Sequence, residues 1–151
     1  MDGALRRLSV TTPFGPVTLV EDQGRLVRLD WREDRAETSP LLTEAVAQLK
    51  AYFERRLTRF DLPFAWGEGL NGDVRRAMAA IPFGETRTYG QIAKVVSAPA
   101  QAVGQACGAN PLPILIPCHR VTGTDWFGGF SAPGGVETKA ALLRHEGALL
   151  L

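Results

Sequence analysis

The chain has 151 residues, of which 45% are hydrophobic and 22% are charged, so it can bury a core and is neither disordered nor fibrous. Its formal net charge is +1 and the parts before and after residue 66 are each close to neutral, so any face that binds phosphates must be a local one. No signal segment and no apolar run of roughly 20 residues is present, so we expect a cytoplasmic protein that does not associate with membranes.

The first part of the chain is predicted to form a small β-sheet covered by a helix. Residues 8–31 alternate apolar and polar side chains, with breaks at 15–16 and 23–24. Ser39 followed by Pro40 is typical of a helix start. The apolar residues after it recur at helical spacing: Leu42, Ala45, Val46, Leu49, Tyr52 and Phe53. Nothing here indicates chemistry, so residues 1–65 are predicted to be a bracing domain.

A second, mostly helical domain is predicted over residues 66–151, which makes the fold class α+β. Asn71, Gly72 and Asp73 are predicted to cap its first helix, which ends at Pro82-Phe83-Gly84.

Two short helices are predicted next, one beginning within residues 86–94 and one running from residue 99 or 100 to 108, with a break between them. This is the outline of a helix-turn-helix, whose second helix normally enters a groove of DNA. A last helix is predicted over residues 136–150, with Val136, Ala140, Leu142 and Leu143 facing inward.

The end of the apolar run 112–116 places a nucleophile beside a possible base. Cys118 precedes His119, and a thiol becomes strongly nucleophilic only as the thiolate, which a neighbouring imidazole or cation favours. Free cysteine is also among the most buried residue types and packs as a small hydrophobe. The pair alone leaves both interpretations open.

Cysteine usage limits the other kinds of site. Cys107 and Cys118 are too few for a disulfide scaffold and suit a reducing compartment. His119 and His145 have no cysteine pair near them at the spacing of a zinc site, and residues 1–65 contain neither Cys nor His. We therefore expect neither a metal nor a cofactor.

Several motifs occur in a fixed order along the second domain. They are Asn110-Pro111, Pro117-Cys118-His119-Arg120, Gly128-Gly129-Phe130-Ser131 and His145-Glu146-Gly147. With them the chain resembles the DNA alkyltransferases that repair guanine alkylated at its 6-oxygen, the methylated-DNA-protein-cysteine methyltransferases. The resemblance is strong from about residue 70 onward and only architectural over residues 1–65.

The resemblance implies a single-turnover enzyme acting as a monomer on double-stranded DNA. A methyl or other alkyl group would pass from the 6-oxygen of guanine, less readily from the 4-oxygen of thymine, to Cys118. His119 would take the thiol proton through a water molecule, and Glu146 would orient the imidazole. Asn110 matches the hinge asparagine that braces the turn before the active-site segment.

The resemblance also implies residues that receive the base. Guanine in a duplex hides its 6-oxygen, so the nucleotide must be extruded into a pocket. Tyr89 matches a tyrosine that assists this rotation, although it could equally be a helix-start residue packing on the core. Phe130 would stack on the base and Ser131 would contact the 6-oxygen region. Arg120 is expected to anchor structure, and Lys139 is expected to be exposed.

The second helix of the predicted helix-turn-helix is rich in small residues. Such a helix suits close packing, and it also suits the minor groove, about 6 Å wide, where the family's helix binds. The predicted DNA contacts are Gln101, Ala102 and Gly104, with Thr88 from the preceding helix.

Gln101 stands where the family has an arginine that fills the gap left by the flipped guanine. Glutamine is shorter and uncharged, so we expect weaker repair of duplex DNA with the chemistry intact. Two alternatives remain. One is an alkyltransferase-like protein that binds lesions with little transfer, against which the presence of Cys118 argues; the other is a cysteine hydrolase with no role on DNA.

Overall fold

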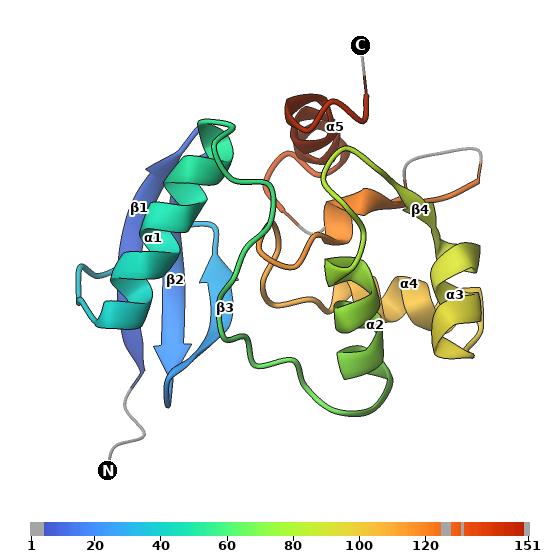
Figure 1. The fold of residues 1–151 in the computed structure, drawn as a ribbon, viewed down its shortest axis with the longest axis horizontal. Helices are drawn as coiled ribbons and strands as arrows, with labels where there is room; N and C mark the ends of the chain where they lie inside the picture. Colours follow the sequence, from blue (N-terminus) through green and yellow to red (C-terminus); the bar gives the residue numbers. More distant parts are fainter. Residues whose placement is uncertain (1–4, 125–127, 131, 150–151) are drawn as a thin grey trace. The chain divides into compact units, whose positions relative to one another are not determined.

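The computed structural model describes residues 5–124, 128–130 and 132–149, and the chain divides into two compact units, residues 1–65 and 66–151 (Figure 1). Each unit buries apolar side chains of its own. Within the described ranges, no helix is long and apolar enough to cross a membrane.

The first unit is an antiparallel sheet with one helix against it. Its strands are β1 (Arg6–Thr12), β2 (Gly15–Asp22) and β3 (Arg25–Asp30), hydrogen-bonded in that order. Gln23 and Gly24, with φ of 53° and 79°, form the tight turn between β2 and β3, as the sequence predicts. The break predicted at residues 15–16 was misplaced: the turn between β1 and β2 lies at residues 13–14, and Gly15 already begins β2.

Helix α1 (Pro40–Phe53) lies along this sheet (Figure 1). Ser39 is its N-cap, and the Ser39 hydroxyl accepts a hydrogen bond from the Leu42 amide at 3.0 Å. Pro40 is the first residue of the helix, where its lack of an N–H group costs no hydrogen bond. The predicted helix start is confirmed. The helix buries Leu42, Ala45, Leu49 and Tyr52.

The second unit consists mainly of short helices. They are α2 (Gly69–Ala79), α3 (Tyr89–Val96), α4 (Ala100–Gly108) and α5 (Val136–His145), with a one-turn 3-10 helix, η1, at Cys118–Arg120. The two-residue strands β4 (Arg87–Thr88) and β5 (Val121–Thr122) pair in parallel. The α+β class is confirmed, and the buried run from Leu112 to Ile116 lies in the core of this unit.

Two predicted helix boundaries were wrong. Helix α2 begins at Gly69, with Glu68 as its N-cap, so Asn71, Gly72 and Asp73 lie inside the helix and do not cap it. Gly72 is needed there because a Cβ would collide with the Gly67 carbonyl.

Helix α5 ends at His145 and not at residue 150. Gly147 adopts a φ of 78°, and the Ala148 amide donates to the Leu143 carbonyl at 2.9 Å, which is a Schellman closure of the helix. Ala140, Leu142 and Leu143 are buried as predicted. Val136 is 47% exposed, so its predicted inward placement was wrong.

Candidate active site

The nucleophile candidate Cys118 lies at the start of η1, where the buried run 112–116 ends. The Cys118 amide donates to the Ile116 carbonyl at 2.8 Å, which fixes the thiol at the edge of the core. Its side chain is partly exposed, whereas His119 and Arg120 beside it are buried. One turn of helix therefore directs a thiol to a surface pocket and an imidazole into the interior.

Asn110 closes the loop that leads to Cys118. Its side-chain amide donates to the Ile116 carbonyl at 2.9 Å, and its side-chain carbonyl accepts from the Leu112 amide at 3.1 Å. The closed loop holds Ile114 at a φ of 72°, which is costly for a β-branched residue. Burial of Ile114 and the two bonds of Asn110 offset that cost, so the loop has one fixed shape.

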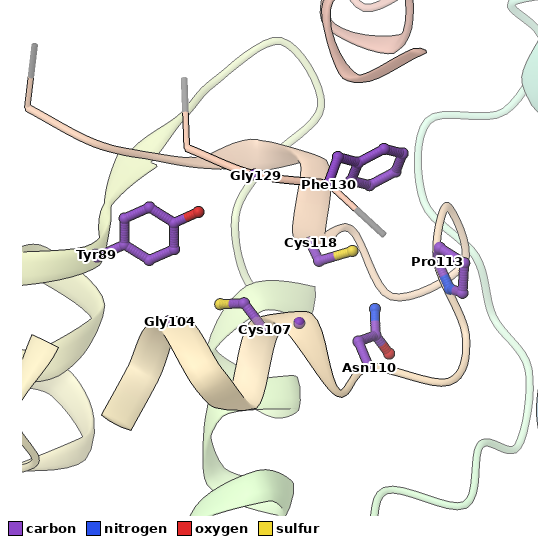
Figure 2. A pocket seen from close by; sticks show the side chains of 9 residues that line it. Tyr89, Gly104, Cys107, Asn110, Pro113, Cys118, Gly129 and Phe130 are labelled. Atoms are coloured by element: carbon purple, nitrogen blue, oxygen red, sulfur yellow. The ribbon is translucent and has the colours of Figure 1, made fainter. Parts of the chain in front are cut away.

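Cys118 opens onto a pocket of about 170 Å³ (Figure 2). In Figure 2 the thiol lies at the centre, with Tyr89 on one side and Phe130 and Pro113 on the other. The pocket is lined by Tyr89, Gly104, Cys107, Gly108, Asn110, Pro113, Cys118, Gly129 and Phe130. Two aromatic rings and several small residues can hold a flat heterocycle against one of the two thiols in the wall.

Behind the thiol, His119, Arg120 and Glu146 form a buried network. His119 Nε2 lies 2.7 Å from Glu146 Oε2, and Arg120 donates to both carboxylate oxygens at 2.8 and 2.9 Å. A third Arg120 bond, at 2.6 Å, goes to the Ile81 carbonyl. Arg120 thus anchors structure, as the sequence analysis expects. With the carboxylate at Nε2, the proton of a neutral imidazole lies on that nitrogen, which leaves Nδ1 as an acceptor.

The network sets the charge state of each member. Burial raises the pKa of Glu146, but hydrogen bonds from His119 and Arg120 outweigh burial and lower that pKa to about 2. Burial, together with the charges of Arg120 and Lys139, lowers the pKa of His119 more than Glu146 raises it. The imidazole is therefore neutral at pH 7, and an ionised carboxylate is in place to stabilise its protonated form.

Burial raises the pKa of Cys118, so the thiol is protonated at rest. The hydrogen bond from Asn110 and the positive charge of Lys139 both oppose this rise. Cys107, the other thiol in the pocket wall, has its pKa raised to about 12, chiefly by burial. Lys139 lowers the pKa of both thiols, and the Asn110 side chain lowers that of Cys118 in addition.

Lys139 is fully buried, so the expectation that it would be exposed was wrong. Its ammonium group donates to the Val121 carbonyl at 2.6 Å and the Gly129 carbonyl at 3.3 Å. It also lies 5.9 Å from the centroid of the Tyr89 ring. These partners come from distant parts of the chain. Burial lowers the pKa of the Lys139 ammonium group to about 8.

Lys139→Met is expected to slow the alkylation of Cys118 by iodoacetamide about fivefold at pH 7, a charge effect on the order of 1 kcal/mol. The ammonium stabilises the thiolate, so its loss moves the alkylation midpoint to higher pH. The difference in alkylation rate between the parent protein and Lys139→Met is greatest below pH 8, where Lys139 is protonated, and shrinks above pH 8. Lys94→Met, at an exposed lysine, serves as the control. A midpoint that does not move would contradict this role for Lys139.

Tyr89 begins α3 and packs against the loop that follows β5. Gly128 has a φ of 81°, and a Cβ on it would collide with the Tyr89 ring and hydroxyl. A glycine is thus required for this approach. Burial raises the pKa of Tyr89, so its hydroxyl is a neutral hydrogen-bond donor at the pocket.

Two family models cover nearly the whole chain. The model described as 6-O-methylguanine DNA methyltransferase, DNA binding domain, matches residues 70–148, and the one described as 6-O-methylguanine DNA methyltransferase, ribonuclease-like domain, matches residues 5–66. The chain belongs to this methyltransferase family.

Relatives support the same assignment over the full length. Proteins named methylated-DNA–protein-cysteine methyltransferase from Mycobacterium tuberculosis and Methanosarcina barkeri are 39% and 37% identical, each over 91% of this chain and over 90% and 94% of their own. The crystal structure of Mycobacterium tuberculosis OGT in complex with DNA is similar with a TM-score of 0.83 and 38% identity, covering 94% of this chain and 92% of that one. The resemblance inferred from the motifs is confirmed.

Within this methyltransferase fold, the predicted residues fall into four groups. The pocket brings together Cys118, Asn110, Tyr89, Phe130 and Gly104. The buried pair His119 and Glu146 lies behind it. Ser131 is outside the described residues.

The remaining predicted DNA contacts do not line the pocket. Gln101 is exposed on α4 and Ala102 is half-buried beside it. The Thr88 hydroxyl accepts from the Gln91 amide at 3.1 Å and thereby caps α3. The sequence analysis missed Lys139. Its spacing could have indicated burial, because Lys139 lies on the same helical face as Leu142, Leu143 and Glu146.

Proposed function

We propose that the protein repairs DNA by moving an alkyl group from the 6-oxygen of guanine to Cys118, in one irreversible turnover. The observation that carries this is a partly exposed thiol in an aromatic-walled pocket, directly followed by a buried imidazole bonded to a carboxylate. The names of the relatives point to methylated DNA, and the descriptions of the family models point to guanine methylated at its 6-oxygen.

The chemistry is a single displacement. Cys118 Sγ attacks the alkyl carbon as the bond from that carbon to the guanine oxygen breaks, so the protein gains a thioether and guanine leaves with the electron pair. Because burial keeps the thiol protonated, a base must remove its proton. Among the described residues, His119 Nδ1 has no hydrogen-bond partner, so it is available to accept that proton through a water molecule.

Glu146 and Asn110 support the step. The Glu146 carboxylate holds the imidazole by Nε2 and stabilises the positive charge that forms on it. Asn110 lies in the wall of the same pocket and lowers the pKa of the Cys118 thiol, which favours the thiolate. A leaving guanine takes up a proton as it departs, and the Tyr89 hydroxyl at the pocket is a neutral donor that can assist.

We propose that a flipped guanine from double-stranded DNA fills the pocket, with Phe130 against the base and Ser131 near the 6-oxygen. Helices α3 and α4, joined through Ser97–Pro99, would act as the helix-turn-helix, with Thr88, Gln101, Ala102 and Gly104 at the DNA. Helix α4 contains no charged residue, so its side chains suit a narrow groove more than a phosphate contact. We further propose a monomer that works in the cytoplasm.

Gln101→Arg is expected to accelerate repair of a duplex about tenfold, because a charged donor strengthens a hydrogen bond in the groove by roughly 1.5 kcal/mol or more. The rate with a free alkylated guanine base should stay unchanged, since no duplex is opened. Gln105→Arg adds the same charge one turn further along α4 and controls for charge alone. If Gln101→Arg repairs the duplex no faster than Gln105→Arg, position 101 is not the one that fills the gap left by the flipped guanine.

The proposed function is tested by single-turnover repair of matched oligonucleotides. Duplexes that carry methylated guanine, methylated thymine or no lesion are mixed with the protein, and the remaining lesion is counted. We expect one guanine lesion removed per protein molecule, and slower removal from thymine. Tight binding without removal would instead support the alkyltransferase-like alternative. A protein that neither binds the duplex nor removes the lesion would overturn a role on DNA.

A further inference from the structure

Arg75 of α2 reaches the C-terminal end of α4. Its Nη2 donates to the Ala109 carbonyl at 3.4 Å, and its Nη1 donates to the Trp66 carbonyl at 3.0 Å. The last turn of α4 has no basic residue of its own. Helix C-termini carry unpaired carbonyls and partial negative charge, so a cation there is stabilising. Arg75 supplies that cation from a neighbouring helix.

The surrounding backbone is shaped to admit the guanidinium. Gly67 has a φ of 83°, and a Cβ on it would lie 2.5 Å from Arg75 Nη1. Gly72 in turn lets the Gly67 carbonyl approach α2. Arg75 forms no ion pair with any carboxylate that the structure describes. Both hydrogen bonds of this half-buried cation go to backbone carbonyls, and its buried Nε has no partner among the described residues, so we assign Arg75 to holding backbone.

We propose that Arg75 is a positioning residue for Cys118, which acts by fixing Ala109 and therefore the adjoining Asn110. Asn110 follows Ala109 directly and bonds both sides of the loop 112–116, including the Ile116 carbonyl that also accepts from the Cys118 amide. Asn110 and Cys118 line the same pocket. A shift of the α4 end would therefore move Asn110 and release the loop that holds the thiol in place. The proposal rests on the role of Cys118 as nucleophile given under Proposed function.

The other ionisable groups around the thiol do not share this route. They are Lys139 on α5, Cys107 on α4, Tyr89 on α3 and the adjoining His119. Arg75 has no hydrogen bond to any of them among the described residues. Its effect on Cys118 should therefore pass through Asn110 alone.

The test measures iodoacetamide alkylation of Cys118 against pH, with the modified residue located by peptide fragmentation. Arg75→Met should slow alkylation at pH 7 about two- to tenfold, the range of an ordinary hydrogen bond, and move the midpoint to higher pH. Arg75→Lys keeps a cation at the end of α4 and should recover part of the loss. Arg76→Met, at the exposed neighbouring arginine, should match the parent protein.

A double-mutant cycle with Asn110→Ala decides the route. We expect Arg75→Met to add no further loss once Asn110 is alanine. The proposal is overturned if Arg75→Met leaves the pH profile of alkylation unchanged. It is also overturned if the double variant loses alkylation rate by the product of the two single-variant factors. If Arg75→Met does not fold, the same criteria apply to Arg75→Lys. Iodoacetamide needs neither DNA nor guanine, so a parent protein that fails to repair DNA would refute the proposed function and leave this test valid.

Discussion

Cys118→Ser is expected to abolish alkyl transfer while leaving binding of the lesion intact. A serine hydroxyl is a far weaker nucleophile than a thiolate, and loss of the nucleophile costs a factor on the order of 10⁶ in other covalent catalysts. The change replaces one small side chain by another at a partly exposed position, so the fold should persist. Single-turnover loss of methylated guanine and gel-shift binding report the two properties separately.

Cys107→Ser is the matched control for this prediction. It makes the same atomic change in the wall of the same pocket, at a thiol whose pKa is raised to about 12. We expect Cys107→Ser to retain transfer, because that thiol is not the acceptor. Transfer that survives in Cys118→Ser, or disappears in Cys107→Ser, would assign the nucleophile to the wrong residue.

Glu146→Gln is expected to lower the free energy of unfolding by about 3–5 kcal/mol, the cost of removing one partner from a buried ion pair. Arg120 would remain buried with a neutral amide in place of its carboxylate, and His119 would lose the charge that stabilises its protonated form. Alkyl transfer should therefore slow even in the folded fraction. Urea unfolding and single-turnover rates measure the two effects. Glu137→Gln, at an exposed carboxylate of the same helix, should change stability by about 0.5 kcal/mol or less.

The same carboxylate gives a pH signature. The pKa of Glu146 is about 2 in the folded protein against an ordinary value of 4.5, so its contribution is complete above pH 4.5 and is lost as the pH falls toward 2. The lowered pKa of His119 adds a loss below its ordinary value of 6.5. In Glu146→Gln the loss between pH 4.5 and 2 should be much smaller. An unchanged acid-unfolding curve would show that Glu146 is not the ionised partner.

The sequence motifs predicted which residues meet at the candidate site because each of them lies in a short, recognisable segment. Cys118 and His119 are adjacent, and the resemblance connected them to Glu146, whose carboxylate lies 27 residues along the chain from His119. The helix start at Ser39 was predictable for a local reason, since the cap and the proline are neighbours. Local signals and family motifs thus account for most of the fold and for the centre of the site.

Features that depend on distant backbone were not predictable. Lysine is usually exposed, and Lys139 can be buried because the carbonyls of Val121 and Gly129 accept hydrogen bonds from its ammonium group. The early start of α2 depends on the fit of Gly72 against Gly67, and Arg75 acts on Ala109 across 34 residues. The helical spacing of Lys139 could have indicated that it is buried, but the carbonyls that accept its hydrogen bonds, and the contacts of Gly72 and Arg75, leave no pattern in the sequence.

The most direct test of alkyl transfer to Cys118 follows a labelled methyl group from DNA to protein. A duplex whose guanine carries an isotopically labelled 6-oxygen methyl group is incubated with the protein, and the peptide spanning residues 95–120 is fragmented, because trypsin leaves Cys107 and Cys118 together. We expect one labelled methyl group per chain, located on Cys118, and unmethylated guanine in the DNA. A label that stays in the DNA, or is found on Cys107, would contradict transfer to Cys118.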